Sequence, residues 1–149
     1  MRIGFDAKRA FYNLSGLGNY SRDTISSLMK NYPENEYFLY TPRKKKQIHF
    51  VEDEDNVNII YPEGFKRFYQ SYWRSISLGG RINKDNLDIY HGLSNELPAN
   101  IIQTDTKKIV TIHDLIFMRY PELYKSLDRE IYQQKFFEAS LAADKIIAM

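Results

Sequence analysis

The pattern of apolar and polar positions along the chain predicts two kinds of element in alternation. Short apolar runs bounded by turn residues predict strands, and these runs are residues 2–6, 36–42, 57–62, 87–91, 107–114 and a last one that begins at residue 145. Between them, apolar residues three or four positions apart predict helices, and these are the segment behind Gly16, residues 65–79 and residues 127–143. Strands that alternate with helices predict an α/β fold, with a Rossmann-like, open, mostly parallel sheet and helices on both of its faces.

The spacing of apolar residues and the positions of glycine and proline support the helix predictions. The first stripe starts at Tyr20 and repeats every four residues to Tyr32, with Ile25 and Met29 beside it on the same face, and Pro33 ends the helix. The last helix carries an i, i+4, i+7, i+11 stripe that starts at Tyr132. Between these two helices, Gly79-Gly80 is expected to break or cap the helix that precedes it.

The composition is that of one globular domain. The 149 residues are enough for a sizeable core, and 43% of them are apolar and 27% charged. The high share of aromatic residues, with 12 Tyr and 9 Phe, is compatible with a sugar or nucleotide pocket. Because no internal repeat or low-complexity linker interrupts the pattern, residues 1–149 are expected to form a single domain.

Charge and cysteine content narrow the function classes. A net charge of +2 is too small to indicate nucleic-acid binding, and the absence of cysteine excludes disulfides, zinc–thiolate sites and cysteine nucleophiles. The sequence shows no signal-peptide pattern and no apolar run near the roughly 20 residues that span a bilayer, so a cytoplasmic location is expected. The charged runs at 43–46 and 52–55 are expected to be solvated loops, with contact between the basic run and anionic lipid at the inner face of the membrane as the alternative.

Candidate chemistry gathers where the predicted strands end. A glycine loop follows the first strand, His91 and Asn95 follow the fourth, and His113-Asp114 follows the fifth. In open parallel sheets, ligands bind beyond the carboxyl ends of the strands, near the point where the strand order reverses. These residues are therefore expected to lie along one cleft.

The glycine loop reads G-x-G-x-x-S, from Gly16 through Gly18 to Ser21. It lacks the third glycine and the tight link to the strand of the dinucleotide fingerprint, and "YTP" stands where that fingerprint has an acidic residue. A nicotinamide or flavin site is therefore not expected. Two interpretations stay open: a turn that only admits the next helix, or close backbone approach to an anion at the start of that helix.

The histidines allow three interpretations. His113-Asp114 resembles the metal-binding dipeptide of HD phosphohydrolases, but those enzymes add further ligands on helices, and this chain has only His49 and His91 besides. A buried structural histidine is the second interpretation. The third is a histidine that faces the cleft and donates a hydrogen bond to a substrate hydroxyl or phosphate, or moves a proton. A Ser-His-Asp hydrolase is not expected, because no G-x-S-x-G occurs.

Five segments in order resemble a known family. They read "MRIGFDAKRA", "GLGNYSRDTISSL", "DIYHGLSNELP", "VTIHDLIFMRYPE" and "DREIYQQKFFEASLAADKIIA", and they span nearly the whole chain. They are similar to the amino-terminal half of retaining GT-B glycosyltransferases, and within that fold to family 4, which includes bacterial mannosyl- and glucosyltransferases. The "VTIHDL…P" segment with "AD.IIA" behind it is the more specific part, whereas G-x-G-x-Y alone is weak.

The resemblance implies roles for the candidate residues. The loop that reaches the donor phosphates or the acceptor is made of Gly16, Leu17, Gly18, Asn19 and Tyr20. His113 is the implied catalytic residue, which contacts the transferred sugar and acts by position and electrostatics rather than as a general base. The acceptor side of the cleft is lined by His91, Asn95 and Asp114.

The resemblance also implies a reaction. A hexose such as mannose or glucose moves from a nucleotide-sugar to a glycan or lipid-linked acceptor with its configuration retained, without a metal or a cofactor. In the family the donor is bound mainly by a second, carboxy-terminal domain, which these 149 residues do not contain, so we expect the chain alone to be inactive. Two alternatives remain: a non-catalytic module that binds a sugar phosphate, and a metal-dependent hydrolase that uses His113-Asp114.

Overall fold

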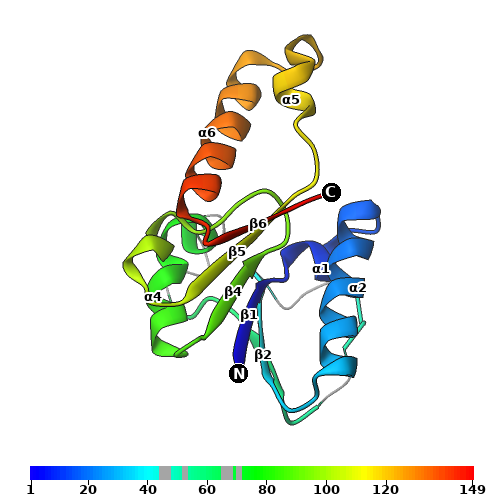
Figure 1. Cartoon of the computed structure of the whole chain (residues 1–149), viewed down its shortest axis with the longest axis vertical. Coiled ribbons are helices and arrows are strands. Elements are labelled where there is room, and N and C mark those ends of the chain that lie inside the picture. Colours follow the sequence, from blue (N-terminus) through cyan, green and yellow to red (C-terminus); the bar gives the residue numbers. More distant parts are fainter. Residues whose placement is uncertain (44–47, 52–53, 65–68, 70–71) are drawn as a thin grey trace.

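The computed structural model describes the chain except for residues 44–47, 52–53, 65–68 and 70–71 (Figure 1). The basic run 43–46 and the first part of the helix predicted over 65–79 fall mostly in these gaps, and half of the acidic run 52–55 does, so the expectations for those residues lie outside the described part of the chain.

The described strands form one parallel sheet, in which every predicted strand is present. They are β1 (Arg2–Asp6), β2 (Glu36–Tyr40), β3 (Val57–Ile60), β4 (Ile89–Gly92), β5 (Lys107–Ile112) and β6 (Lys145–Ala148). Their order is β3-β2-β1-β4-β5-β6, and each neighbouring pair is parallel. The strand order reverses between β1 and β4, which is where a ligand crevice opens in such sheets.

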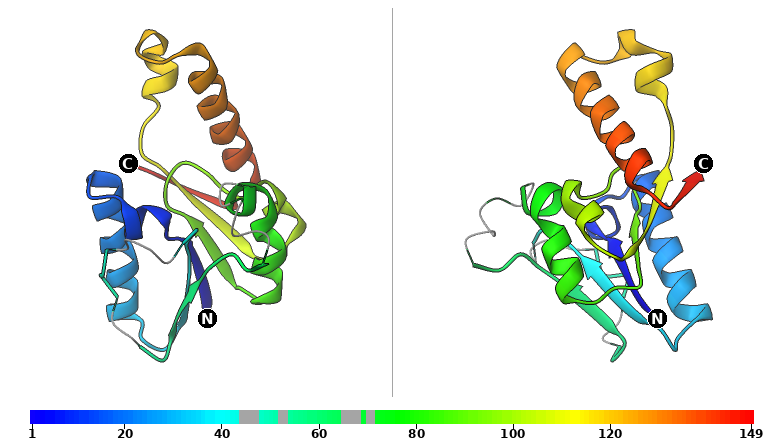
Figure 2. Two further views of the ribbon diagram at one scale, coloured as in Figure 1. Left: turned by 180° about the vertical axis from the view of Figure 1, so that it is seen from behind. Right: turned by 60° about the vertical axis from the view of Figure 1, so that its left-hand side comes forward.

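Helices cover both faces of the sheet. In chain order the described helices are α1 (Lys8–Tyr12), α2 (Gly16–Asn31), the π-helix η2 (Trp73–Ser77), α4 (Leu78–Lys84), the 3₁₀ helix η3 (Ala99–Gln103), α5 (Ile116–Arg119), the 3₁₀ helix η4 (Pro121–Leu123) and α6 (Ser126–Ala142). Helices α1 and α2 lie on one side of the sheet and α4 on the other (Figures 1 and 2). The predicted α/β, Rossmann-like fold is therefore confirmed.

The alternation of side chains along each strand separates two cores. On β1, Phe5 packs into the cluster that faces α1 and α2, with Ile25 and Met29 of α2. On the opposite face, Tyr90 of β4 packs with Trp73 of η2 in a cluster that also takes in α4. Successive residues of a strand point to opposite faces. Each strand end therefore presents one side chain to each layer.

One prediction about the helices was wrong, and one short helix was not predicted. Residues 79 and 80 do not break a helix but lie inside α4, and a β-carbon at Gly79 would come within 2.6 Å of the backbone oxygen of Asn100. The link between Asp6 and Gly16 contains the short helix α1, which the sequence analysis does not predict. The helix face predicted from Tyr20 is the face of α2 that packs on the sheet: Ile25 and Met29 are buried, and Tyr20 and Leu28 are half-buried against the same core.

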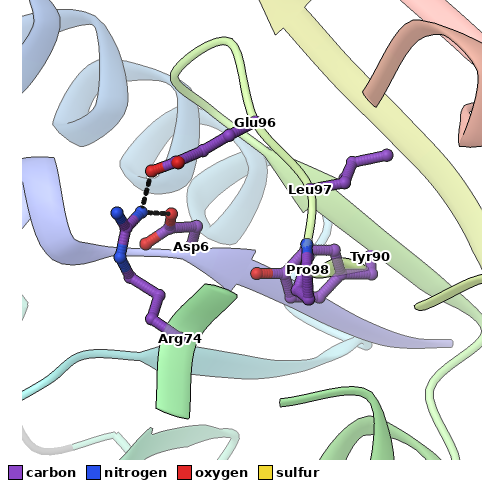
Figure 3. Close-up of a pocket in the computed structure, with 6 residues that line it drawn as sticks. All are labelled: Asp6, Arg74, Tyr90, Glu96, Leu97 and Pro98. Carbon is purple, nitrogen blue, oxygen red and sulfur yellow. Dashed lines mark hydrogen bonds and ion pairs between the residues drawn. The ribbon is translucent and has the colours of Figure 1, made fainter. Parts of the chain in front are cut away.

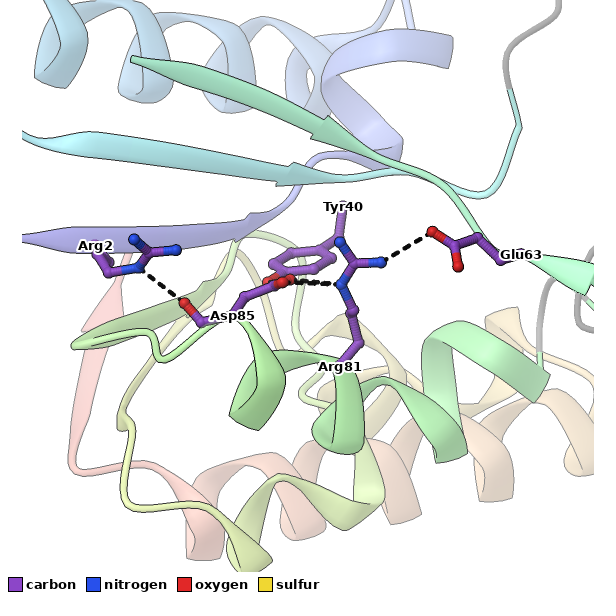
Figure 4. A network of polar contacts seen from close by, with 5 residues as sticks. All are labelled: Arg2, Tyr40, Glu63, Arg81 and Asp85. Carbon is purple, nitrogen blue, oxygen red and sulfur yellow. Dashed lines mark hydrogen bonds and ion pairs between the residues drawn. The ribbon is translucent and has the colours of Figure 1, made fainter. Parts of the chain in front are cut away.

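A polar network ties α4 to the sheet (Figure 4). The hydroxyl of Tyr40 donates to Asp85 Oδ2 at 2.8 Å, and Arg81 Nε donates to both carboxylate oxygens of Asp85 at 2.9 and 2.8 Å. Arg2 Nε donates to the backbone oxygen of Asp85 at 2.8 Å. Burial and the bond to Asp85 raise the pKa of Tyr40, which therefore stays a neutral donor. This network is structural, because its side chains bond to one another.

Helix α6 projects beyond the sheet together with α5 (Figure 1). Ala139 is its one fully buried residue, and it packs against Val110 and Ile112 of β5. Among the described residues, no helix is both long enough and apolar enough to cross a bilayer.

Candidate functional site

Two groups of polar side chains meet at the carboxyl ends of β1, β4 and β5, one on each face of the sheet. The first, here called the histidine cluster, consists of Tyr20, His91, Asn95, Thr111 and His113 on the α2 face. The second, here called the arginine pocket, is lined by Asp6, Arg74, Tyr90, Glu96, Leu97 and Pro98 on the α4 face (Figure 3). Both groups lie beside the point where the strand order reverses, the expected ligand position for this fold.

His113 is held in place from two sides. Its ring Nε2 lies 2.8 Å from the backbone oxygen of Leu93, and its backbone N–H donates to Asn95 Oδ1 at 2.8 Å. Because a carbonyl oxygen only accepts, Nε2 carries the proton and Nδ1 is left for another group. The half-buried ring meets the edge of Tyr20, with centroids 4.9 Å apart. The structure thus brings His113, Asn95 and Tyr20 together.

Asn95 fixes the loop that follows β4. Its φ is +60°, a left-handed conformation that asparagine adopts more readily than most residues. Its N–H donates to the backbone oxygen of Thr111 at 2.9 Å, and its side chain bonds to His113. The amide oxygen is therefore used to orient His113.

His91 lies inside the molecule rather than on the surface of the cluster. The residue is 5% exposed, and its ring Nε2 lies 2.8 Å from the hydroxyl of Thr111. The hydroxyl of Tyr20 lies 3.0 Å from the same Thr111 oxygen. Burial lowers the pKa of His91 to about 4, so its ring is neutral near pH 7. His91 thus helps to fix the hydroxyl of Thr111, to which Tyr20 also bonds.

This burial predicts a pH dependence of stability. The pKa of His91 falls from 6.5 unfolded to about 4 folded, so between these values the unfolded chain binds a proton that the folded chain does not. The free energy of unfolding should fall by about 2–3 kcal/mol as the pH drops through this window, and this contribution should level off below it. Urea titrations from pH 7 to pH 4 measure the slope. His91→Gln should remove it and His49→Gln, at an exposed position, should keep it; an unchanged slope in His91→Gln would contradict the assignment.

The predicted glycine loop is the first part of α2 rather than a loop. Among the described residues, the N–H groups of Gly16 and Leu17 have no hydrogen-bond partner. At Gly18 a β-carbon would lie 1.7 Å from the backbone oxygen of Asn13. The side chain of Asn19 accepts from Arg22 at 2.5 Å. Gly18 is thus fixed by packing, and the free N–H groups of the first turn are available to an anion.

Asp114 begins a helix. Its Oδ1 accepts the N–H of Ile116 at 3.1 Å, where α5 starts, and its side chain is exposed. Within the ranges that the structure describes, no three His, Asp or Glu side chains lie close enough together to hold a metal ion.

The arginine pocket was missed by the sequence analysis. Arg74 Nη1 donates to Asp6 Oδ2 at 2.7 Å and forms an ion pair with Glu96, whose other oxygen accepts from Lys135 Nζ at 2.7 Å (Figure 3). Burial alone would raise the pKa of Glu96, but Arg74 and Lys135 outweigh it and hold the pKa below its usual range. Asp6 could have been singled out from the sequence, because it is a charged residue at the end of an apolar strand. Arg74 could not, because nothing in the aromatic segment around it distinguishes this arginine from a surface residue.

Comparison of the chain with models of known protein families, with curated proteins and with solved structures gives no match.

Proposed function

We propose that the chain is the amino-terminal, acceptor-side domain of a retaining GT-B glycosyltransferase, which moves a hexose from a nucleotide-sugar to a glycan or lipid-linked acceptor. The proposal rests on the resemblance of five sequence segments and on one feature of the structure. That feature is His113, whose ring is fixed by Leu93 at the carboxyl end of β5 with Nδ1 left for a ligand. Because the ring is already held in one orientation, it does not have to be ordered when a sugar binds beside it.

The start of α2 supports an anionic group near His113. Tyr20, one turn into α2, contacts the His113 ring, so the helix begins beside the histidine. The free N–H groups of Gly16 and Leu17 and the helix dipole favour negative charge there. In the proposed reaction, that charge is the phosphate that leaves the donor sugar. Nδ1 of His113 accepts from a hydroxyl of the transferred hexose and positions the sugar while negative charge develops on the phosphate.

We prefer this proposal to a metal-dependent hydrolase because His113 and Asp114 are not arranged as a pair of metal ligands. Asp114 bonds to the N–H of Ile116 and has no contact with His113 among the described interactions. A non-catalytic module that binds a sugar phosphate would use the same groups, and only a measurement of transfer separates it from the enzyme.

The test is His113→Ala in the product of the complete reading frame. We expect kcat for transfer from a nucleotide-sugar to fall about a hundredfold, since a misplacement of about 1 Å of the reacting sugar typically costs that much. His49→Ala, at an exposed histidine, is the control and should keep the activity. A panel of nucleotide-sugars, with transfer and hydrolysis both measured, covers the unknown donor.

Two results would refute the proposal. One is a wild-type product that neither transfers nor hydrolyses any donor of the panel, and the other is unchanged kcat in a folded His113→Ala protein. If that variant does not fold, His113→Gln, which can still donate to Leu93, takes its place with the same expected loss.

A further inference from the structure

Helix α6 carries a row of exposed side chains on the side opposite its packed one. The helix projects beyond the sheet, and its packed side is marked by the buried Ala139, which lies against Val110 and Ile112 of β5 (Figures 1 and 2). On the other side, five residues follow the alternating spacing of four and three positions that is typical of a coiled-coil seam. This row, here called the α6 seam, consists of Leu127, Ile131, Gln134, Glu138 and Leu141.

The apolar members of the α6 seam are not packed against the protein. Leu141 is 86% exposed, Leu127 67% and Ile131 43%, and none of them belongs to a hydrophobic core of the described part of the chain. Phe137, which flanks the seam near its middle, is 46% exposed. At about 200 Å² for a fully exposed large side chain, the four expose about 500 Å² together, which is the size of apolar patches that are often functional.

The middle of the α6 seam is polar. Gln134 Nε2 donates to Glu138 Oε1 on the same helix at 2.8 Å, and both residues are exposed. An amide has two N–H groups and a carboxylate about four acceptor positions, so each residue can make a further hydrogen bond. A carboxylate is costly to bury in lipid. The seam therefore fits a protein surface that supplies polar partners at its centre.

The order of residues along the α6 seam is complementary to a second α6 seam that runs in the opposite direction. In one antiparallel register, Ile131 meets Leu141 of the second copy. In the same register, the amide of Gln134 meets the carboxylate of Glu138 of the second copy, and the two-fold axis repeats both contacts. A shift by one seam position puts Glu138 against the apolar Leu127, and a parallel pair puts Glu138 against its own copy, a like-charge contact.

We propose that the α6 seam is a self-association surface, through which two copies of this chain form an antiparallel, two-fold dimer. The apolar surface removed from water on both copies is about 1,000 Å², near the lower limit for a specific interface. The dimer is therefore weak, with a Kd in the micromolar range or above. The inference is independent of the proposed function, because the seam shares no residue with the histidine cluster.

The test is sedimentation equilibrium of the 149-residue chain over concentrations from about 1 μM to about 1 mM. We expect the weight-average mass to rise from 17.7 kDa towards twice that value. Ile131→Glu and Leu141→Lys should each raise the Kd at least about tenfold, because a charge then faces an apolar side chain. An equimolar mixture of the two variants should restore association, because the new glutamate of one chain then meets the new lysine of the other.

The matched control is Leu14→Lys. Leu14 is 81% exposed, much like Leu141, but lies in the link before α2, so its replacement should leave the Kd unchanged. The exposed Gln134 gives a second pair of variants for the case that Ile131→Glu does not fold. Gln134→Lys should lower the Kd about threefold and Gln134→Glu should raise it about threefold, because position 134 faces the carboxylate of Glu138 of the second copy.

Four results would overturn the inference. A chain that stays monomeric up to about 1 mM forms no such dimer. Association that survives the substitutions at Ile131 and Leu141 takes place at another surface. A mixture of these two variants that stays monomeric would refute the antiparallel register. A monomeric chain that binds phosphatidylcholine vesicles, and loses this binding in Leu141→Lys, would make the seam a membrane contact instead.

Discussion

Replacement of Arg74 by methionine is expected to lower the free energy of unfolding by about 3–5 kcal/mol, as removal of one partner from a buried ion pair typically does. Arg74 is 11% exposed at its side chain and Asp6 only 5%. Without the guanidinium, the Asp6 carboxylate keeps one hydrogen bond, from the N–H of Lys8 at 3.2 Å. Glu96 keeps Lys135. Urea unfolding at pH 7 measures the loss.

The same variant should change the response to acid. The pKa of Glu96 is held below the unfolded value of 4.5, so its contribution to stability is present above pH 4.5 and is lost as the pH falls through the folded pKa. Without Arg74 the folded pKa of Glu96 rises, because burial then opposes the charge with less compensation. The stability difference between wild type and Arg74→Met should therefore shrink as the pH falls, because protonation neutralises Glu96 in the variant before it does so in the wild type.

The control for Arg74 is Arg119→Met. Arg119 is exposed and lies over the ring of Tyr120, 5.6 Å from its centroid, so its loss should cost less than about 1 kcal/mol. If Arg74→Met costs as little as Arg119→Met, the carboxylates are not held by Arg74 and the electrostatic account of the pocket is wrong.

Most of the fold could be predicted from the sequence, because the strands are continuous apolar runs. The run at 107–114 is one example, and it appears as β5 (Lys107–Ile112). The errors came from tertiary contacts that a local pattern does not encode. The sequence predicts that Gly79 breaks a helix, yet Gly79 lies inside α4. Its missing side chain leaves space for the backbone of Asn100, which packs against this helix. Helix α1 is only five residues long and too short for a periodic signal.

The candidate site was predicted in part. The strand ends located His113 and Asn95, and the structure joins them through a hydrogen bond. The contact between Tyr20 and Thr111 spans 91 residues and depends on how α2 packs across β5. Arg74 reaches Asp6 in the same way, from a π-helix 68 residues away. Sequence position indicates which strand ends carry polar groups, but the partners across the sheet follow from packing.

Replacement of Gly18 by alanine is expected to cost about 3 kcal/mol or more. The new β-carbon would lie 1.7 Å from the oxygen and 2.6 Å from the carbon of the Asn13 carbonyl. That carbonyl is backbone and accepts from Arg22 at 2.9 Å, so it cannot move aside cheaply. Overpacking against a fixed group costs 1–3 kcal/mol and sometimes more, and here α1 and α2 would have to separate.

Gly16→Ala provides the matched control, since the two glycines belong to one motif and differ in surroundings. A β-carbon at Gly16 meets nothing within 4 Å, and the residue opens α2. Alanine there should leave stability unchanged or raise it by up to about 1 kcal/mol, because it restricts the unfolded chain. Thermal unfolding of Gly16→Ala and Gly18→Ala shows whether each position needs glycine for close packing or for a flexible backbone. Equal losses would mean that the motif needs flexible backbone at both positions, whereas a loss confined to Gly18 assigns that glycine to helix packing and leaves the N–H groups at Gly16 and Leu17 for a ligand.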